Sequence, residues 1–256
     1  MKEAQFYGRL AAYYDFICSD RRADVEILLK LISKHKKTDG NRLLDISCGT
    51  GLEDKYLKKQ FDVTGLDLND GVLQIARKRN RDVRYLKGDM RTFDLKRKFD
   101  VLACFDAMMY LKSKREIQKA IKNFYRHLEN GGLLVFYIDG TFLKEHNKEK
   151  SKVIIEKKFT KKLSVILFLS YQRRENSVLS RDIFFITENG KSRVEVEPTS
   201  KLGLFSVKEI RKAVEKTGFK VYIYATDPAT SFSAKKYDPK SSAPVFVCVK
   251  DQKASG

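Results

Sequence analysis

The chain of 256 residues lacks several patterns that would assign it at once to a common class of protein. It has no apolar run long enough to span a bilayer. Its first residues also lack the successive charged and apolar regions of a signal peptide. These two absences predict a cytoplasmic protein that does not associate with a membrane.

Cysteine and histidine are scarce, with 4 and 3 residues respectively. The cysteines, Cys18, Cys48, Cys104 and Cys248, are widely separated and include no C-x-x-C pair, so we expect neither a disulfide framework nor a zinc site. Cys48 and Cys104 follow predicted strands, where small buried side chains pack. His127, in the last turn of a predicted helix, is expected on the surface. No catalytic side chain is assigned.

Two familiar nucleotide-binding motifs are missing as well. A dinucleotide fingerprint G-x-G-x-x-G that starts at Gly49 requires Gly or Ala at position 54, where the chain has Asp54. The sequence also has no G-x-x-x-x-G-K-[ST], so it lacks the lysine-containing loop that holds a triphosphate. NAD and nucleoside triphosphates are therefore disfavoured as ligands.

A short apolar segment followed by small residues is the most informative feature that is present. Residues 43–51 read LLDISCGTG, in which the apolar run includes Asp45 and then gives way to Ser47, Gly49 and Gly51. Glycine has no Cβ, so the backbone can turn sharply here and lie against a bound molecule. A buried parallel strand with such an end is typical of a nucleotide-type site.

Further strands along the chain also end near acidic residues. The segment 61–67 ends in Asp67, whose carboxylate can accept hydrogen bonds from both hydroxyls of a ribose. Gly88, Asp89 and Met90 follow the next predicted strand. Residues 99–106 contain a fourth strand. Four such segments in this order and spacing indicate one shared binding site.

The series resembles the S-adenosylmethionine-dependent methyltransferases of the Rossmann-like class, over about 13–139 and again over 205–219. The resemblance implies S-adenosylmethionine as the cofactor. In that family a tyrosine of a Tyr-Asp pair, with a basic residue after it, reaches the cofactor's amino-acid end. Tyr14 fits the first role and Arg21 or Arg22 the second, unless Tyr13 and Tyr14 merely fix their helix to the core. The other residues that the resemblance implies are Asp45, Ser47, Gly49 and Gly51 around the methionine portion, Asp67 on the ribose, Leu68, Asp89 and Met90 at the adenine, and Phe105 over the pocket.

Strands and helices alternate through the first half of the chain. This alternation predicts an α/β fold, with a mostly parallel Rossmann-like sheet that has helices on both faces and an antiparallel last strand. Gly131 and Gly132 are expected to end the helix that precedes the fifth strand. The predicted helices are 3–17, 22–36, 52–60, 70–79 and 114–129, and the predicted strands are 42–47, 62–67, 82–87, 99–105, 132–139, 219–225 and 245–250.

Residues 151–200 have a different pattern, with β-rich runs separated by turn signals. Asn189-Gly190 predicts a hairpin turn, and Ser206 with Glu209 predicts a capping box that opens the last helix. We expect three parts: 1–140, the N-terminal helices and cofactor-binding core; 141–204, an antiparallel insertion that shapes the acceptor pocket and pairs two subunits; and 205–256, which completes the core sheet.

The formal charge of +19 raises the question of a nucleic-acid partner. The positive excess is spread over the whole chain, whereas a nucleic-acid-binding module concentrates it, and a surface rich in Lys and Glu is also common in thermophilic proteins. The one local cluster, between Arg77 and Arg81, is interpreted as the solvated end of a helix. No specific nucleic-acid partner is expected.

The residues after the fourth strand bear on the methyl acceptor. They are Cys104, Phe105, Asp106 and Ala107, not the Asn/Asp-Pro-Pro-Tyr/Phe of enzymes that modify adenine or glutamine nitrogen, and no Pro-Cys motif for cytosine is present. Both differences favour a small-molecule acceptor, and the chain is similar to small-molecule N-methyltransferases that act on amino sugars or glycine. Two alternatives stay open: an RNA methyltransferase that uses the basic surface, and a cofactor-binding protein without activity. Asp106, Tyr110 and Tyr137 are candidates to position an acceptor, or are structural.

Overall fold

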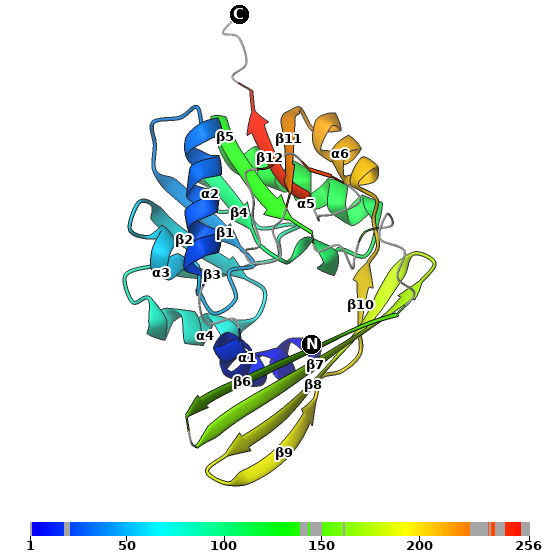
Figure 1. Ribbon diagram of the computed structural model, residues 1–256. Helices are drawn as coiled ribbons and strands as arrows, with labels where there is room; N and C mark the ends of the chain where they lie inside the picture. The colour runs from blue at the N-terminus through cyan, green and yellow to red at the C-terminus, as the bar shows by residue number, and fades with distance from the viewer. Residues whose placement is uncertain are drawn as a thin grey trace, which may run out of the picture.

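The protein is described here from a computed structural model, which describes residues 2–17, 21–138, 143, 150–160, 162–225, 235, 237–238 and 244–251. These residues contain two sheets, one of seven strands and one of five. Figure 1 shows the seven-stranded sheet with its helices as one body and the five-stranded sheet below it. Cys18 lies outside the described residues.

The larger sheet has the strand order β11-β12-β5-β4-β1-β2-β3. The strands β1 to β5 pair in parallel, whereas β12 is antiparallel to both of its neighbours, β5 and β11. The predicted fold class is therefore confirmed. The strands are β1 (Arg42–Ile46), β2 (Asp62–Asp67), β3 (Arg84–Lys87), β4 (Phe99–Cys104), β5 (Leu128–Tyr137), β11 (Phe219–Ala225) and β12 (Pro244–Lys250).

Helices cover both faces of this sheet, because its strands are apolar on both sides. Side chains of α2 and α4 pack in one buried cluster, and side chains of α5 and α6 pack in the other. Ser206 and Glu209 form the predicted capping box at the start of α6. The helices are α1 (Lys2–Ile17), α2 (Arg22–His35), α3 (Asp54–Leu57), α4 (Asp70–Arg79), α5 (Lys114–His127) and α6 (Val207–Lys216), with a 3-10 turn η1 (Met108–Tyr110).

Two boundaries differ from the sequence-based prediction. The helix expected over 52–60 is the single turn α3. The helix α5 ends at His127 and β5 begins at once, because Leu128 already has extended backbone angles and its side chain is buried. Gly131 and Gly132 therefore lie inside a strand and do not close the helix. Gly131 has a φ of 80°, and the pairing of β4 with β5 shifts register in this region, as at a β-bulge.

The smaller sheet is antiparallel throughout, with the order β10-β8-β7-β6, and β9 pairs with β8. Asn189 and Gly190 have φ values of 52° and 79°, which confirms the predicted hairpin turn between β8 and β9. The strands are β6 (Lys150–Thr160), β7 (Leu163–Arg174), β8 (Ser177–Glu188), β9 (Lys191–Val196) and β10 (Ser200–Gly203).

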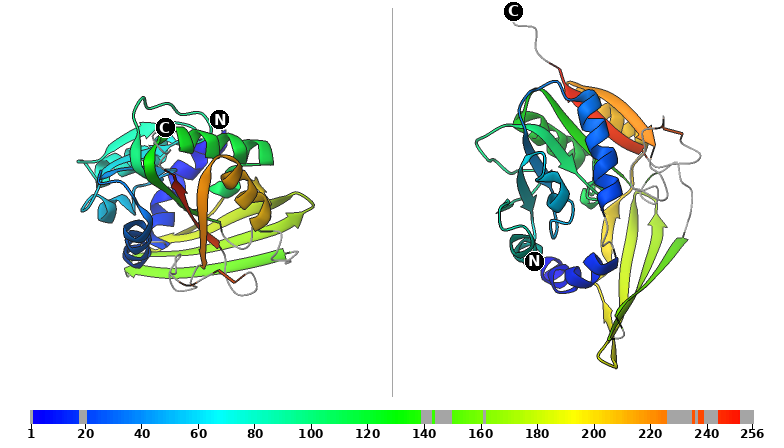
Figure 2. Two further views of the ribbon diagram at one scale, coloured as in Figure 1. Left: turned by 90° about the horizontal axis from the view of Figure 1, so that it is seen from above. Right: turned by 60° about the vertical axis from the view of Figure 1, so that its left-hand side comes forward.

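The small sheet is attached to the core at two places. The helix α1 lies between the sheet and α4 in both Figure 1 and Figure 2, and Leu10 and Ile17 of α1 pack with buried side chains of β7 and β8. At the other attachment β10 packs on the end of η1. A Cβ built on Gly203 would lie 2.1 Å from the carbonyl oxygen of Leu111, so this approach requires glycine. The division of the chain into three parts stays a prediction.

Candidate cofactor site

The carboxyl ends of β1, β2 and β4 lie side by side, because β1 pairs in parallel with both other strands. The residues that follow β1 and β4 both have the left-handed conformation that non-glycine residues rarely adopt: φ is 60° at Ser47 and 45° at Asp106. Gly49 and Gly51 also have positive φ values, of 54° and 69°. Strained backbone of this kind gathers where a loop must hold a ligand.

The two glycines of the loop have different roles. A Cβ built on Gly51 would lie 2.4 Å from the hydroxyl of Tyr85 and 2.9 Å from the amide nitrogen of Asn80. Gly51 therefore lets the loop pack on the polar side chains below it, and Asn80 donates a 2.8 Å hydrogen bond to its carbonyl oxygen. A Cβ on Gly49 would meet no atom within 4 Å among the described residues. Gly49 thus faces open space, as a residue beneath a ligand does.

The carboxylate of Asp67 joins the loop after β1 to the loop after β2. It accepts hydrogen bonds from the backbone nitrogens of Gly49, at 2.9 Å, and Asn69, at 2.8 Å. Burial raises the pKa of Asp67. Two carboxylate oxygens offer about four acceptor positions, so the group retains capacity for further hydrogen bonds. Leu68, beside it, is 56% exposed, which is unusual for a leucine and leaves an apolar surface at this edge.

Asp89 is held by an arginine that sequence reasoning missed. The guanidinium of Arg91 bonds its carboxylate at 2.6 Å and also reaches Glu116 at 2.6 Å. The hydrogen bond from Arg91 lowers the pKa of Asp89, so the carboxyl is charged. Met90 is half-buried against the core, and Phe105, at the end of β4, is buried.

A pair of buried carboxyl groups lies under the glycine loop. Asp45 is 1% exposed, and neither of its carboxylate oxygens has a hydrogen-bond partner among the described residues. Asp54 is also buried and accepts a 2.7 Å hydrogen bond from Tyr85 through one oxygen, while its other oxygen has no partner there. Burial raises the pKa of Asp45 well above its usual value, and the neighbouring Asp54 adds to this rise. A proton held between the two carboxyls would give one oxygen of each a hydrogen-bond partner.

The N-terminal residues divide between two surroundings. Tyr14 packs with the apolar side chains between α1 and the small sheet. Arg21 bonds Glu53, just beyond the glycine loop, at 2.8 Å, whereas Arg22 lies over the ring of Tyr56 at 5.9 Å. Of the two arginines, it is Arg21 that contacts a residue next to the loop.

Asp15 was not assigned a role from the sequence, although it follows Tyr13 and Tyr14. One of its carboxylate oxygens accepts a 2.6 Å hydrogen bond from the hydroxyl of Thr50, and the other accepts one of 2.6 Å from Arg79. Arg79 also donates to the carbonyl oxygen of Thr50 at 2.6 Å. The interpretation of the Arg77 to Arg81 cluster as a solvated helix end is thus wrong for Arg79, which ties α4 to α1 and the loop.

His127 is buried, so its predicted place on the surface is wrong. Its Nδ1 lies 2.9 Å from the carbonyl oxygen of Asn123, and its Nε2 accepts a 3.3 Å hydrogen bond from the backbone of Leu95. The reason is that α5 runs directly into β5, which carries the last turn of the helix into the core. Cys48, Cys104 and Cys248 are free and buried, so the packing role of the first two is confirmed.

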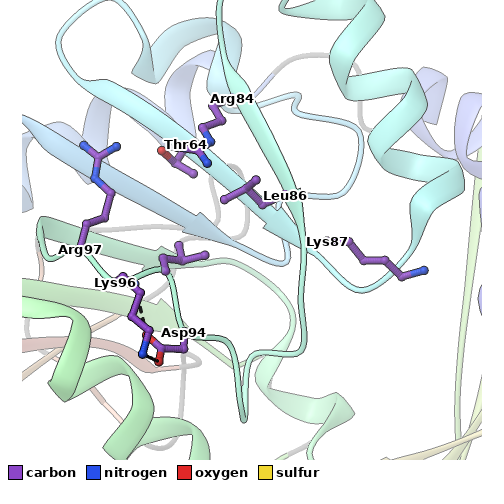
Figure 3. A pocket seen from close by; sticks show the side chains of 8 residues that line it. Thr64, Arg84, Leu86, Lys87, Asp94, Lys96 and Arg97 are labelled. Atoms are coloured by element: carbon purple, nitrogen blue, oxygen red, sulfur yellow. Dashed lines mark hydrogen bonds and ion pairs between the residues drawn. The ribbon is translucent and has the colours of Figure 1, made fainter.

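A cavity of about 260 Å³ lies at the β2–β3 edge of the sheet (Figure 3). Half of its lining residues are cations, and the one acidic residue of the lining, Asp94, is paired with Lys96. None of the residues that line it is a predicted cofactor residue, so this cavity is separate from the predicted site. Figure 3 labels Thr64, Arg84, Leu86, Lys87, Asp94, Lys96 and Arg97.

Within the described residues, no group of three or more His, Cys, Asp or Glu side chains is arranged to hold a metal ion. In the same residues, no helix is long and apolar enough to cross a membrane.

Comparison with known proteins agrees with this geometry. Residues 43–132 match the methyltransferase domain family. A dTDP-3-amino-3,4,6-trideoxy-alpha-D-glucopyranose N,N-dimethyltransferase of Streptomyces venezuelae is 38% identical over 118 residues, which are 45% of this chain and 49% of that protein. A dTDP-3-amino-3,6-dideoxy-alpha-D-glucopyranose N,N-dimethyltransferase of Streptomyces fradiae is 33% identical over 139 residues, which are 52% of this chain and 54% of that protein. The matches thus span about half the length of these relatives.

The crystal structure of Streptomyces venezuelae DesVI superposes with a TM-score of 0.78 at 26% identity and covers 92% of this chain and 96% of that one. The fold match therefore extends well beyond the glycine loop, into the helices and the small sheet. The chain carries a methyltransferase domain of the Rossmann-like class, whose members use S-adenosylmethionine.

Proposed function

We propose that this protein transfers a methyl group from S-adenosylmethionine to the amine nitrogen of a small molecule, and that the acceptor is an amino sugar carried by a nucleotide. Relatives with this named activity support the acceptor class. The observation that carries the proposal is the open space above Gly49, bounded by the Asp67 carboxylate and the ends of β1, β2 and β4.

The residues at these strand ends fit the cofactor. Asp67 would hold the ribose hydroxyls, Gly49 would lie against the methionine portion, and exposed Leu68 would cover the adenine. Asp89 would accept from the adenine amino group, held in place by Arg91. S-adenosylmethionine supplies a methyl group on a positively charged sulfur atom that becomes a neutral thioether when the methyl group leaves.

The remaining predicted residues have supporting roles in this proposal. Phe105, just after β4, would close the pocket. Arg21, which bonds Glu53 next to the loop, would reach the cofactor's amino-acid end, and Tyr14 would fix α1 to the small sheet. Asp45 would support the glycine loop from below, since its side chain is buried. With a neutral leaving group, the protein's main tasks are orientation of the acceptor and exclusion of water. Asp15 and Thr50 would fix the loop that holds the methyl donor.

Two measurements test the proposal. A calorimetric titration with S-adenosylmethionine should show binding, and incubation with dTDP-3-amino-3,6-dideoxyglucose should give mono- and dimethylated products by mass spectrometry. The corresponding nucleotide sugar with a hydroxyl in place of the amine should stay unmethylated. Binding without transfer to any of a panel of amines would favour the alternative of a cofactor-binding protein without activity.

The outer face of the small sheet supports a second proposal, that two copies of the chain pair through it. Ile154, Phe168, Ile183 and Val196 are directly paired neighbours across four strands, β6 to β9. A second row contains Ile166, Phe185 and Val194. Ile154, Phe185, Val194 and Val196 are exposed. An apolar patch of this extent is unusual on a monomer, and a two-fold axis would cover it with its own copy.

A groove of about 630 Å³ lies between α5 and α6 and is the observation that favours the binding of a nucleic acid. Cations dominate its lining, and among the described residues Lys119, Lys122, Arg126 and Lys216 have no carboxylate partner within salt-bridge distance. Its surface lysines and arginine would attract a phosphate backbone without reading bases. Salt-sensitive, non-specific RNA binding is therefore expected as a secondary property. A cytoplasmic location stays a prediction.

A further inference from the structure

The inner face of the small sheet changes from apolar to polar and back to apolar along β8. Residues two apart share a face of a strand, and the inner face contains Val178, Ser180, Asp182, Phe184 and Ile186. Val178 packs in the core cluster with β4 and α5, whereas Phe184 and Ile186 pack with α1. Ser180 and Asp182 lie between these two apolar contacts. The sheet thus presents polar groups where it passes between α1 and the core.

Glu197 lies beside Asp182 on this face. Its backbone nitrogen donates a 2.9 Å hydrogen bond to the carbonyl oxygen of Asp182 and so extends the β8–β9 pairing by one residue. Since Glu195 pairs with Phe184, which is an inner residue, Glu197 also points inward. Ser180 donates a 3.1 Å hydrogen bond to the Asp182 carboxylate.

Within the part of the chain that the structure describes, the two carboxyl groups have no cation of their own. Burial raises the pKa of Glu197 to about 7, and the neighbouring Asp182 adds to the rise. Burial likewise raises the pKa of Asp182. Among the described residues neither carboxylate has a Lys or Arg within 4.0 Å, although the chain has 52 of these residues. Half-buried carboxyls without a positive partner are costly, and a bound cation would relieve that cost.

Tyr110 lies on the core side of the attachment between the core and the small sheet. It ends η1, the turn on which β10 packs, and its neighbours Met108 and Met109 are buried. Its own side chain is 53% exposed. Yet burial raises the pKa of Tyr110, and the carboxyls of Asp106, Asp182 and Glu197 add to the rise. The exposed fraction and the raised pKa agree if the ring projects into the space between the core and the small sheet. There, protein would surround the ring and still leave part of its surface accessible.

We propose that Glu197 and Asp182, with the phenol of Tyr110 opposite, bind the protonated amine of the acceptor, and that Glu197 takes a proton from it. This inference rests on the proposed function. An ammonium nitrogen has no lone pair, so it must lose a proton before it attacks. One proton moves from nitrogen to a Glu197 carboxylate oxygen, the freed lone pair bonds the methyl carbon, and the electrons of the broken carbon–sulfur bond stay on sulfur. The methylated nitrogen carries the positive charge that sulfur gives up.

The arrangement also sets specificity for amines over alcohols. A hydroxyl in the place of the ammonium group would leave the two carboxyls without a positive partner, and sites of this kind reject such analogues strongly. The pair sits in the small sheet, whereas the residues assigned to the cofactor sit in the core. Loss of the Glu197 charge should therefore change acceptor binding and leave cofactor binding as it is.

The test compares Glu197→Gln with Glu175→Gln, which makes the same change in the exposed turn between β7 and β8. The probes are dTDP-3-amino-3,6-dideoxyglucose and the nucleotide sugar with a hydroxyl in place of its amine. The wild type and Glu175→Gln should bind the amine at least about tenfold more tightly than the hydroxyl compound. Glu197→Gln should lose this preference while its affinity for S-adenosylmethionine, which reports correct folding, is unchanged. A preference retained in Glu197→Gln overturns the inference.

Kinetics separate this inference from the proposed function. For the wild type, kcat should fall on the acid side as Glu197 becomes protonated, with Asp182, Asp106 and Tyr110 as the other titratable groups around the space. Glu197→Gln should lower kcat and remove that acid limb, and Asp182→Asn should mainly raise KM. Transfer to the amine at the wild-type rate in Glu197→Gln overturns the inference but not the proposed function. Absence of transfer to any amine by the wild type overturns the proposed function. In that case the inference stands or falls with the preference for the amine over the hydroxyl compound and its loss in Glu197→Gln.

Discussion

Asp15 and Thr50 join the N-terminal helix to the glycine loop through a 2.6 Å hydrogen bond between carboxylate and hydroxyl. The second oxygen of Asp15 accepts from Arg79, which in turn bonds the Thr50 carbonyl oxygen. Three segments that are far apart in the sequence, α1, the loop after β1 and the end of α4, thus meet at one carboxylate. Because α1 also packs on the small sheet, this carboxylate links the predicted cofactor loop to the element that carries the predicted acceptor site.

Asp15→Ala should weaken binding of S-adenosylmethionine by about tenfold or more. The change removes two hydrogen bonds to a charged acceptor, each worth about 1.5–3 kcal/mol, and part of that loss falls on the position of the loop. Calorimetric titration measures the effect. The control is Lys78→Ala, an exposed position in α4 next to Arg79. Equal affinities in Asp15→Ala and the wild type would show that α1 does not hold the loop.

Local signals account for the parts of the fold that the sequence predicts. The strand ends at Asp45 and Asp67, the capping box at Ser206 and the turn at Asn189-Gly190 are each encoded within a few residues, and the structure contains all of them. The pair Gly131-Gly132 was misread because glycine suits a helix end and a β-bulge equally well. Pairing of β5 with β4, which lies about thirty residues away in sequence, decides between them.

The parts of the site that sequence reasoning missed depend on long-range contacts. Asp15 and Arg79 are separated by 64 residues, and neither has a neighbour in sequence that reveals the other. Asp182 and Glu197 become a pair through the register of β8 and β9, which the turn at Asn189 fixes. A strand shifted by one residue would send these carboxyls to opposite faces. Arg91 is different, since it stands two residues from Asp89 and could have been assigned from that spacing.

Asp67→Ala should reduce the affinity for S-adenosylmethionine roughly ten- to hundredfold, because it removes two ribose hydrogen bonds to a charged acceptor. It also frees the backbone nitrogen of Gly49, so Asp67→Asn, which can still accept from that nitrogen, isolates the effect of charge. Isothermal titration gives both values. An unchanged affinity in the alanine variant would show that Asp67 does not bind the ribose.

The stability of the protein should fall as the pH rises from about 4 to about 6. Burial raises the pKa of Asp54 from 3.8 to about 6, so in this window the folded chain keeps a proton that the unfolded chain has lost. Because the folded state binds more protons, stability declines with pH through this window. Asp54→Asn should flatten this slope in urea unfolding at pH 4.5, 6 and 8.

Asp82→Asn is the control for that experiment, since Asp82 is an exposed carboxyl that pairs with Lys58. It should leave the decline between pH 4 and pH 6 in place. A slope that is as steep in Asp54→Asn as in the wild type would mean that Asp45 alone holds the proton. Measurement of Asp45→Asn then assigns the slope to the other member of the pair.

RNA binding should be weak and should lose affinity steeply as salt is added. Four of the groove cations, Lys119, Lys122, Arg126 and Lys216, are spread over α5 and α6 and would contact phosphates only. Lys119→Glu with Lys122→Glu should lower the salt slope by about two, whereas Lys30→Glu, an exposed position on α2, should change it little. Sequence-selective binding that persists at physiological salt would promote the RNA methyltransferase alternative.

Phe185→Lys should convert a dimer to a monomer. The side chain lies in the outward apolar patch, paired with Ile166 and Val194 on the neighbouring strands, so a two-fold partner would bury the new charge. Asn176→Lys adds the same charge at an exposed turn of the sheet and should stay dimeric. Sedimentation velocity of the three proteins at micromolar concentration measures their masses, and titration with S-adenosylmethionine checks that each is folded. A wild type that sediments as a monomer at about 100 μM, far above the Kd of a stable dimer, would show that the patch does not pair two copies.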